Sequence, residues 1–212
     1  MNCRNCAAPM ELFDRRRYFF CGHCGTFEFL ERADLEGVQV LERAADALPC
    51  PLCRAPLARA LLDGRHAVQY CEQCRGVLLE RAVFATAVAG RRARAAGPGS
   101  QPAGLDRKEL ERRVVCPSCH KMMEVHPYYG PGNVIIDTCA ACDLVWLDFG
   151  ELRQIADAPG LDRGQVPPEI AAAASAAAAG RMSALDPPAD DSVASGRGLS
   201  VVLGLLAGIL SD

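Results

Sequence analysis

The residues best suited to chemistry in this chain are its twelve cysteines, which form six Cys-x-x-Cys pairs. Two such pairs joined by a hairpin direct four thiolates at one point, which is the arrangement of a structural zinc ribbon. The pattern occurs three times and uses every cysteine, so we expect three structural Zn²⁺ ions. The predicted ligands are Cys3, Cys6, Cys21 and Cys24, then Cys50, Cys53, Cys71 and Cys74, and finally Cys116, Cys119, Cys139 and Cys142.

Size and compartment favour zinc over disulfide bonds for these cysteines. The pairs divide the chain into units of about 25–40 residues, which bury too little apolar surface to fold unaided. A structural zinc ion supplies on the order of 10 kcal/mol. The N-terminus, Met1-Asn2-Cys3, lacks a basic-then-apolar signal, so we expect a reducing, cytoplasmic compartment. Iron stays open as the alternative metal, because four-sulfur sites accept it too.

The elements that must position the cysteines are short. We expect a small metal-stabilised α+β fold in which each ribbon is a β-hairpin with two cysteine knuckles, followed by a short helix. Beyond the third ribbon we expect an alanine-rich helix, a disordered segment and an apolar, glycine-striped terminal helix. The predicted segments are ribbon 1 with its helix at 1–48, ribbon 2 with its helix at 49–90, a flexible linker at 91–104, ribbon 3 with flanking helices at 105–158, and the tail at 159–212.

Local patterns predict individual elements of the first two ribbons. Asp14-Arg15-Arg16-Arg17 separates two short apolar strands of the first ribbon and is expected to be their turn. Residues 31–48 carry apolar side chains at spacings of three and four, which predicts a helix ending at Pro49. In the second ribbon, Asp63-Gly64 suits a two-residue hairpin turn, and Gly90 is expected to end the following helix.

The third ribbon ends in a more distinctive run. Trp146 is expected to pack across the ribbon and fill its small core, with docking of a partner as the alternative. Asp148 and Glu151 have the spacing of a capping box, in which Asp148 accepts from a free helix amide while Glu151 reaches back. A helix over about residues 149–157 should therefore follow.

The third ribbon also resembles a known family. The run Cys-Pro-x-Cys-x-x-x-Met at 116–123, with Asp-x-Cys-x-x-Cys-x-x-x-Trp-Leu-Asp-x-Gly-Glu-Leu at 137–152, resembles the bacterial transcription factor IIB-type zinc fingers. The second ribbon departs from it, with Leu78-Leu79-Glu80 in place of Trp146-Leu147-Asp148, and the first shares mainly its cysteine pairs. The resemblance implies a four-cysteine zinc site in each ribbon, and it brings no settled activity.

Charge suggests one possible target for such ribbons. The net charge is −3, yet residues 49–104 carry eight arginines and three acidic residues. We therefore expect a protein or nucleic-acid interaction module with no small-molecule substrate, and a role in transcription is one option for it. The candidate phosphate contacts are Arg59, Arg65, Arg75, Arg81, Arg91, Arg92 and Arg94.

An enzymatic role is not expected. Catalytic zinc needs an open position for water, which a four-thiolate site does not offer. The histidines at 23, 66, 120 and 126 are scattered, and no nucleophile or phosphate-loop motif is present. Thiol–disulfide exchange at a Cys-x-x-Cys pair is the alternative chemistry.

The apolar end of the chain suggests a different class of function. Residues 199–210 would form a helix of about 18 Å, which is too short to span a bilayer core of about 30 Å. Ser200, Gly204 and Gly208 recur every four residues and would let two helices approach closely. A homo-oligomeric or membrane-peripheral scaffold is therefore the alternative function.

Overall fold

A computed structural model describes residues 1–30, 37–102 and 104–165, which belong to one compact unit. The alanine-rich helix and the apolar segment 199–210 lie outside the described residues, as do residues 31–36. Within the described ranges, no helix is long and apolar enough to cross a membrane.

The first ribbon (residues 1–30) forms its own antiparallel sheet in the order β1-β2-β3. Strands β1 (Glu11–Phe13) and β2 (Tyr18–Phe20) are joined by the 3-10 helix η1 (Asp14–Arg16), which confirms the predicted turn. Strand β3 (Phe27–Phe29), which the sequence analysis did not predict, pairs with β2. The registers place five aromatic side chains on one face of this sheet: Phe13, Tyr18, Phe20, Phe27 and Phe29.

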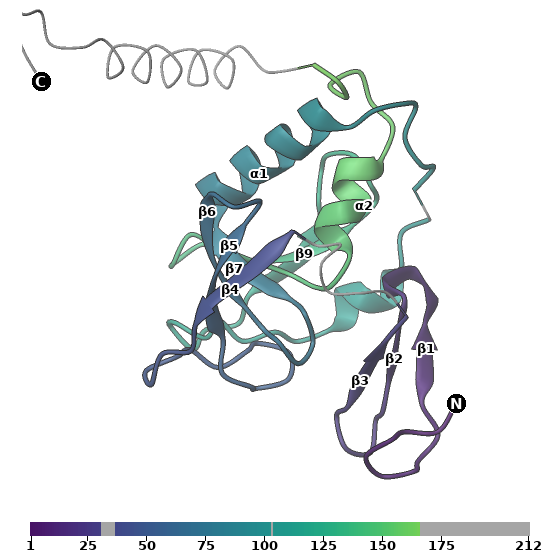
Figure 1. The fold of residues 1–212 in the computed structure, drawn as a ribbon, viewed down its shortest axis with the longest axis vertical. Helices are drawn as coiled ribbons and strands as arrows, with labels where there is room; N and C mark the ends of the chain where they lie inside the picture. Colours follow the sequence, from purple (N-terminus) through teal and green to yellow (C-terminus); the bar gives the residue numbers. More distant parts are fainter. Residues whose placement is uncertain (31–36, 103, 166–212) are drawn as a thin grey trace, which may run out of the picture. The chain divides into compact units, whose positions relative to one another are not determined.

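The second ribbon (residues 50–80) and the third ribbon (residues 116–147) share one seven-stranded antiparallel sheet, in the order β4-β5-β6-β7-β10-β9-β8. Figure 1 shows strands of this sheet beside helices α1 (Arg81–Arg94) and α2 (Glu151–Asp157). Its second-ribbon strands are β5 (Ala58–Leu62), β6 (His66–Tyr70) and β7 (Val77–Glu80). Its third-ribbon strands are β8 (Glu124–Pro127), β9 (Ile135–Cys139) and β10 (Leu144–Leu147). The two ribbons meet where β7 pairs with β10, with Leu79 opposite Val145.

The expected helix at 31–48 is wrong over the described residues 37–48. Strand β4 (Val38–Glu42) lies there instead and pairs with β5. Val38 and Val40 are β-branched and alternate with polar or exposed positions, which suits a pleated strand better than a helix. Gly37 adopts a positive φ of 68°, and its carbonyl accepts from the Asp63 amide at 2.8 Å. Residues 38–42 therefore form a strand because they pair with the edge of β5.

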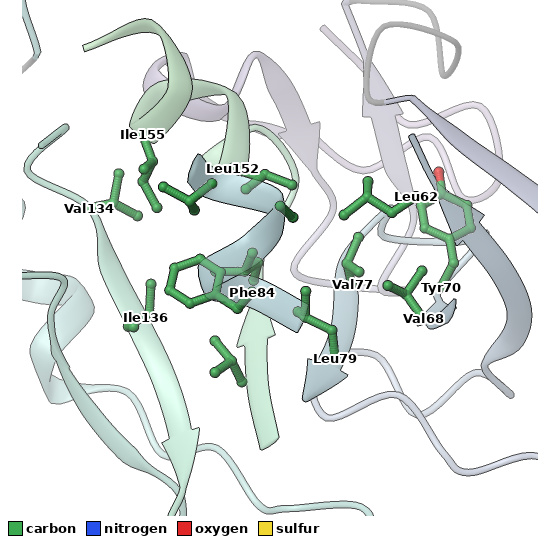
Figure 2. Packing of buried hydrophobic residues seen from close by; sticks show 14 of the residues in the cluster. Leu62, Val68, Tyr70, Val77, Leu79, Phe84, Val134, Ile136, Leu152 and Ile155 are labelled. Atoms are coloured by element: carbon green, nitrogen blue, oxygen red, sulfur yellow. The ribbon is translucent and has the colours of Figure 1, made fainter. Parts of the chain in front are cut away.

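Two helices cover one face of the seven-stranded sheet. Helix α1 (Arg81–Arg94) and helix α2 (Glu151–Asp157) pack on a shared core, in which Phe84 and Ile155 are buried against strand residues. Figure 2 shows Phe84, Leu152 and Ile155 gathered beside Val134 and Ile136. Helix α1 continues four residues beyond Gly90, where we expected it to end and the linker to begin. Its last turn is held by contacts of Arg91 and Arg92 described below.

The opposite face of the sheet carries the second and third cysteine groups. In β10, Val145 and Leu147 join the helix-side core, whereas Trp146 joins the cysteine side. In β7, Leu79 lies on the helix side and Leu78 on the cysteine side. Strands β7 and β10 are therefore buried on both faces. This explains why each of them is a continuous run of apolar residues.

Candidate metal centres and the adjoining groove

The structure brings the twelve cysteines together in three groups of four. In each group the ligand atoms all lie within 4.8 Å of one another, and all twelve thiols are free. The closest Sγ–Sγ pairs within the groups are 3.4 Å (Cys53 to Cys71) to 3.6 Å (Cys3 to Cys24) apart. A tetrahedron with Zn–S bonds of about 2.3 Å has edges of about 3.8 Å, so the groups fit zinc. We call them site 1 (Cys3, Cys6, Cys21, Cys24), site 2 (Cys50, Cys53, Cys71, Cys74) and site 3 (Cys116, Cys119, Cys139, Cys142).

All six cysteine knuckles share one backbone geometry. The residue four positions after each first cysteine has a positive φ, between 53° at Asp143 and 72° at Gly25. In five of the knuckles its amide donates to the carbonyl of that cysteine, at 2.7 to 3.1 Å. This turn directs both thiols to the same side. The left-handed positions are Ala7, Gly25, Arg54, Arg75, His120 and Asp143.

Backbone amides and one hydroxyl support the thiolate form of the cysteines. The amides of Asn5 and Leu52 donate to the sulfurs of Cys3 and Cys50, both at 3.4 Å. The Thr26 hydroxyl lies 3.1 Å from Cys24 Sγ and, together with the Thr26 amide, lowers the pKa of the Cys24 thiol to about 5. Because only thiolates bind metal, these contacts favour zinc binding by the cysteines that receive them.

Trp146 belongs to the core between sites 2 and 3. Its side chain is 1 % exposed, and its indole Nε1 donates to Asp148 Oδ1 at 2.8 Å. The ring lies against the backbone of Gly76, where an added Cβ would come within 2.2 Å of it. The expected packing role of Trp146 is therefore confirmed, and glycine at position 76 is what makes room for the indole.

The capping-box prediction is half right. Glu151 does reach back, because its Oε2 accepts from the Asp148 amide at 2.8 Å. The Asp148 carboxylate makes no cap hydrogen bond and instead accepts from Trp146, Arg16 and Arg112. Asp148 is thus the centre of a buried ionic cluster that the sequence analysis did not predict.

This cluster connects the first ribbon to the third. Arg16, at the end of η1, is 6 % exposed and also bonds Glu151 at 3.0 Å and Glu109 at 3.1 Å. Glu109 belongs to the 3-10 helix η3 (Arg107–Glu111), and the neighbouring Arg112 bonds both Asp148 and Asp137. No sequence signal distinguishes Arg16 from its neighbouring arginines. Its role as an ion-pair partner becomes visible only where the first ribbon contacts the third.

The buried carboxyl groups of the cluster have pKa shifts in opposite directions. Burial opposes ionisation of Asp148, but Arg16 and Arg112 outweigh it and lower the pKa of that carboxyl to about 2. Burial raises the pKa of Glu151 well above its ordinary value, although Arg16 opposes that shift. Asp148 is therefore the carboxylate that the two guanidinium groups stabilise most strongly.

Most of the arginines predicted to contact phosphate bind groups within the chain. Arg91 makes two hydrogen bonds to Asp63, at 2.9 and 3.0 Å, and Arg94 shares the same carboxylate at 3.3 Å. Arg92 is 1 % exposed and donates to the carbonyl oxygen of Ile155 at 2.7 Å. These contacts tie helix α1 to the β5–β6 turn and to helix α2.

The remaining candidates lie nearer the surface. Arg59 pairs with Glu42 at 2.8 Å and Arg81 pairs with Asp143 at 2.9 Å, with all four side chains about half exposed or more. The Arg75 guanidinium lies 4.0 Å from the centroid of the Phe29 ring. Arg65 lies in the loop between β5 and β6. Five of the seven candidate arginines thus contact carboxylate or carbonyl oxygens of the chain itself.

A groove of about 700 Å³ runs beside the aromatic face of the first ribbon. Its lining includes Phe13, Phe20 and Phe27 of the first ribbon and Leu52 and Arg54 of the second ribbon's first knuckle. Gln73, which also lines it, donates to the Gly25 carbonyl at 3.3 Å. The Arg16–Glu109 pair contributes to the lining as well. The groove has the size of a typical ligand or peptide cleft of about 300–1,000 Å³.

Comparison with known proteins adds one finding to this geometry. No curated protein and no solved structure matches the chain. A family model does match the segment that holds site 3, helix α2 and the Trp146–Asp148 contact. The resemblance predicted from residues 116–152 is thereby confirmed: residues 115–158 match the TFIIB-type zinc-ribbon family described as transcription factor zinc-finger.

Proposed function

We propose that this chain is a zinc-stabilised protein-interaction module in which sites 1, 2 and 3 each bind one structural Zn²⁺ through four thiolates. The three closed sulfur groups are the observation that carries the proposal, because their spacing suits tetrahedral zinc. Four protein ligands leave no position for a reactive water. The metal would therefore hold the fold together, and the chain would act by binding rather than by catalysis.

A protein partner is favoured over nucleic acid. Binding to a phosphate backbone requires several arginine or lysine side chains that are free to neutralise phosphates and so displace the counterions condensed on the nucleic acid. Arg91 and Arg92 are engaged by Asp63 and by main-chain carbonyls, and Arg59 and Arg81 already face carboxylates. The family match of the third ribbon supports a partner among transcription proteins, since that is the setting its description names.

Native mass spectrometry of the freshly purified full chain tests the metal part of this proposal. We expect a mass increase for three zinc ions, and loss of the folded charge-state distribution after chelation, because small ribbons depend on metal to fold. A folded chain that retains its structure with fewer ions and oxidised cysteine pairs would contradict it and favour the redox alternative.

A salt titration tests the choice of partner. If nucleic acid were the target, affinity for a DNA duplex would fall steeply with salt, and Arg59→Ala together with Arg81→Ala would flatten that slope. We expect no such binding at physiological salt. Salt-sensitive binding that these substitutions weaken would overturn the assignment to a protein partner.

A further inference from the structure

Strand β1 has an open edge. It lies at the end of the order β1-β2-β3, so among the described residues only one side of it is paired with another strand. The Met10 amide donates to the Met1 carbonyl at 3.1 Å, away from β2. Because backbone groups alternate sides along a strand, the N–H and C=O of Leu12 also face away from β2. Leu12 is 46 % exposed, and it lines the groove together with Glu11 and Phe13.

The outer strands of the seven-stranded sheet differ from β1 in this respect. Strand β4 has a register shift between Val40 and Glu42, and β8 ends in Pro127. Bulges and prolines are devices that prevent further strands from pairing with an edge. Strand β1 has neither device, and its free edge opens on a groove with an apolar wall. Two of the four outer strands thus carry a bulge or a proline, whereas β1 and β3 of the first sheet carry neither, and of these two β1 is the strand whose three residues all line the groove.

Side chains around β1 indicate what would fit there. Glu11 and Phe13 lie on the aromatic face of the sheet, opposite Phe20 and Tyr18 of β2. A strand added to β1 would place one residue directly across from Glu11 and another, two positions away, across from Phe13. Opposite charges and apolar pairs are favoured at such cross-strand positions. The exposed Glu11 carboxylate therefore selects a basic residue, and Phe13 selects an aliphatic or aromatic one.

We propose that the groove beside β1 binds an extended segment of a partner protein, which pairs with the Leu12 edge and places a basic residue across from Glu11 and an apolar residue across from Phe13. This inference rests on the proposed function and identifies its binding surface. Main-chain hydrogen bonds would supply affinity, and the alternate side chains would supply specificity. The apolar residue would lie beside Phe13 on the aromatic face, where the apolar lining of the groove includes Phe13 and the exposed Leu52.

The test uses a displayed library of random twelve-residue peptides, selected on the full, zinc-loaded chain. We expect enriched peptides to carry a basic and an apolar residue two positions apart. Glu11→Lys should select peptides with an acidic residue at the basic position. Glu124→Lys, on the proline-blocked strand β8, is the matched control and should leave the selected motif unchanged.

Fluorescence anisotropy of one enriched peptide then separates the edge from the side chains. Leu12→Pro removes the outward N–H and also fixes φ at this position, and Phe20→Ala removes part of the apolar lining, so each should raise Kd about tenfold or more. Leu12→Ala keeps the N–H and should raise Kd less than about threefold, as should Tyr129→Ala at an exposed aromatic outside the groove. Zinc content and melting temperature of each variant establish that it is folded.

The outcomes separate this inference from the proposed function. Peptides that bind Leu12→Pro and Phe20→Ala as tightly as the natural chain would overturn the groove and leave the interaction module intact. A folded, three-zinc chain that enriches no peptide would overturn both. Binding of single-stranded oligo-dT that competes with the peptide and is lost in Phe20→Ala would assign the aromatic face to base stacking instead.

Discussion

The first ribbon and the fused second and third ribbons use the same cysteine pattern in different structural settings. The second and third share a sheet whose central strands are buried on both faces, with sites 2 and 3 in one apolar cluster around Trp146. The first has a separate sheet and is attached to the third ribbon and its helix by side-chain contacts. Arg16 pairs with Asp148, and the ring centroids of Phe29 and Phe149 lie 4.8 Å apart. The comparison teaches that a metal centre can stabilise one hairpin or a shared core, depending on what its strands pair with.

Replacing one cysteine ligand should show the difference between the two settings most strongly. Cys74→Ser removes the zinc of site 2, worth on the order of 10 kcal/mol, and should also loosen site 3 through the shared core. Cys24→Ser should release only the zinc of site 1 and leave the seven-stranded sheet folded. Native mass spectrometry counts the metals and hydrogen exchange reports the sheet. Loss of all three zinc ions from Cys24→Ser would show that the first ribbon is not independent.

Removal of Arg16 should detach the first ribbon. Arg16→Met removes one of the two guanidinium groups that face the buried Asp148 carboxylate. This should lower the free energy of unfolding by about 3–5 kcal/mol. Arg81→Met is the control, because the exposed Arg81–Asp143 pair should contribute about 1 kcal/mol at most. Chemical denaturation measures both, and limited proteolysis reports release of residues 1–30. Equal effects of the two substitutions would mean that the buried cluster is not what holds the ribbon.

The seam between the second and third ribbons can be tested at Gly76. Gly76→Ala would bring a methyl group within 2.2 Å of the Trp146 ring, and overpacking of this kind costs about 1–3 kcal/mol. Gly22→Ala, where nothing lies within 4 Å, should be nearly neutral. Adding Trp146→Leu, which copies Leu78 of the second ribbon, should relieve the overlap. Thermal melts follow all three variants, and no rescue by the double change would contradict the steric explanation.

The smallest expected effects lie in the knuckles of the first ribbon. Ala7 and Gly25 occupy equivalent left-handed positions, with φ of 59° and 72°. Ala7→Gly should therefore strengthen zinc binding at site 1 by up to about 1 kcal/mol, and Gly25→Ala should weaken it by about as much. Competition with a chromophoric chelator measures both affinities. Changes of the same sign would show that the shared turn does not control loading.

Sequence predicted the cysteine groups and the Asp63-Gly64 hairpin turn, because both depend on residues close together in the chain. Strands β5 and β6 flank Asp63-Gly64 as predicted, and both residues have positive φ. The loop has three residues, Asp63 to Arg65, and not the expected two, because Leu62 pairs with His66. The metal groups follow from spacing alone, since two short pairs on a hairpin can meet in only one way. Local geometry of this kind can be derived from the sequence alone.

Long-range pairing was harder to predict. The apolar residues at 38 and 41 suit a helix or a strand, and the free edge of β5 selects the strand. The continuous apolar runs Val77-Leu78-Leu79 and Val145-Trp146-Leu147 are the one signal that two ribbons share a sheet, because strands buried on both faces read in this way. Burial of Arg16 depends on a surface more than a hundred residues away, which no local pattern reports.

The pairing of β7 with β10 also joins strands that are made at different times. Leu79 is synthesised about 65 residues before its partner Val145, a delay of about 3–13 s at about 5–20 residues per second. During that interval the apolar edge of β7 has no partner in its own chain. Nascent copies on neighbouring ribosomes could pair through it, so early zinc loading of site 2 and prompt completion of the third ribbon would together limit misassembly.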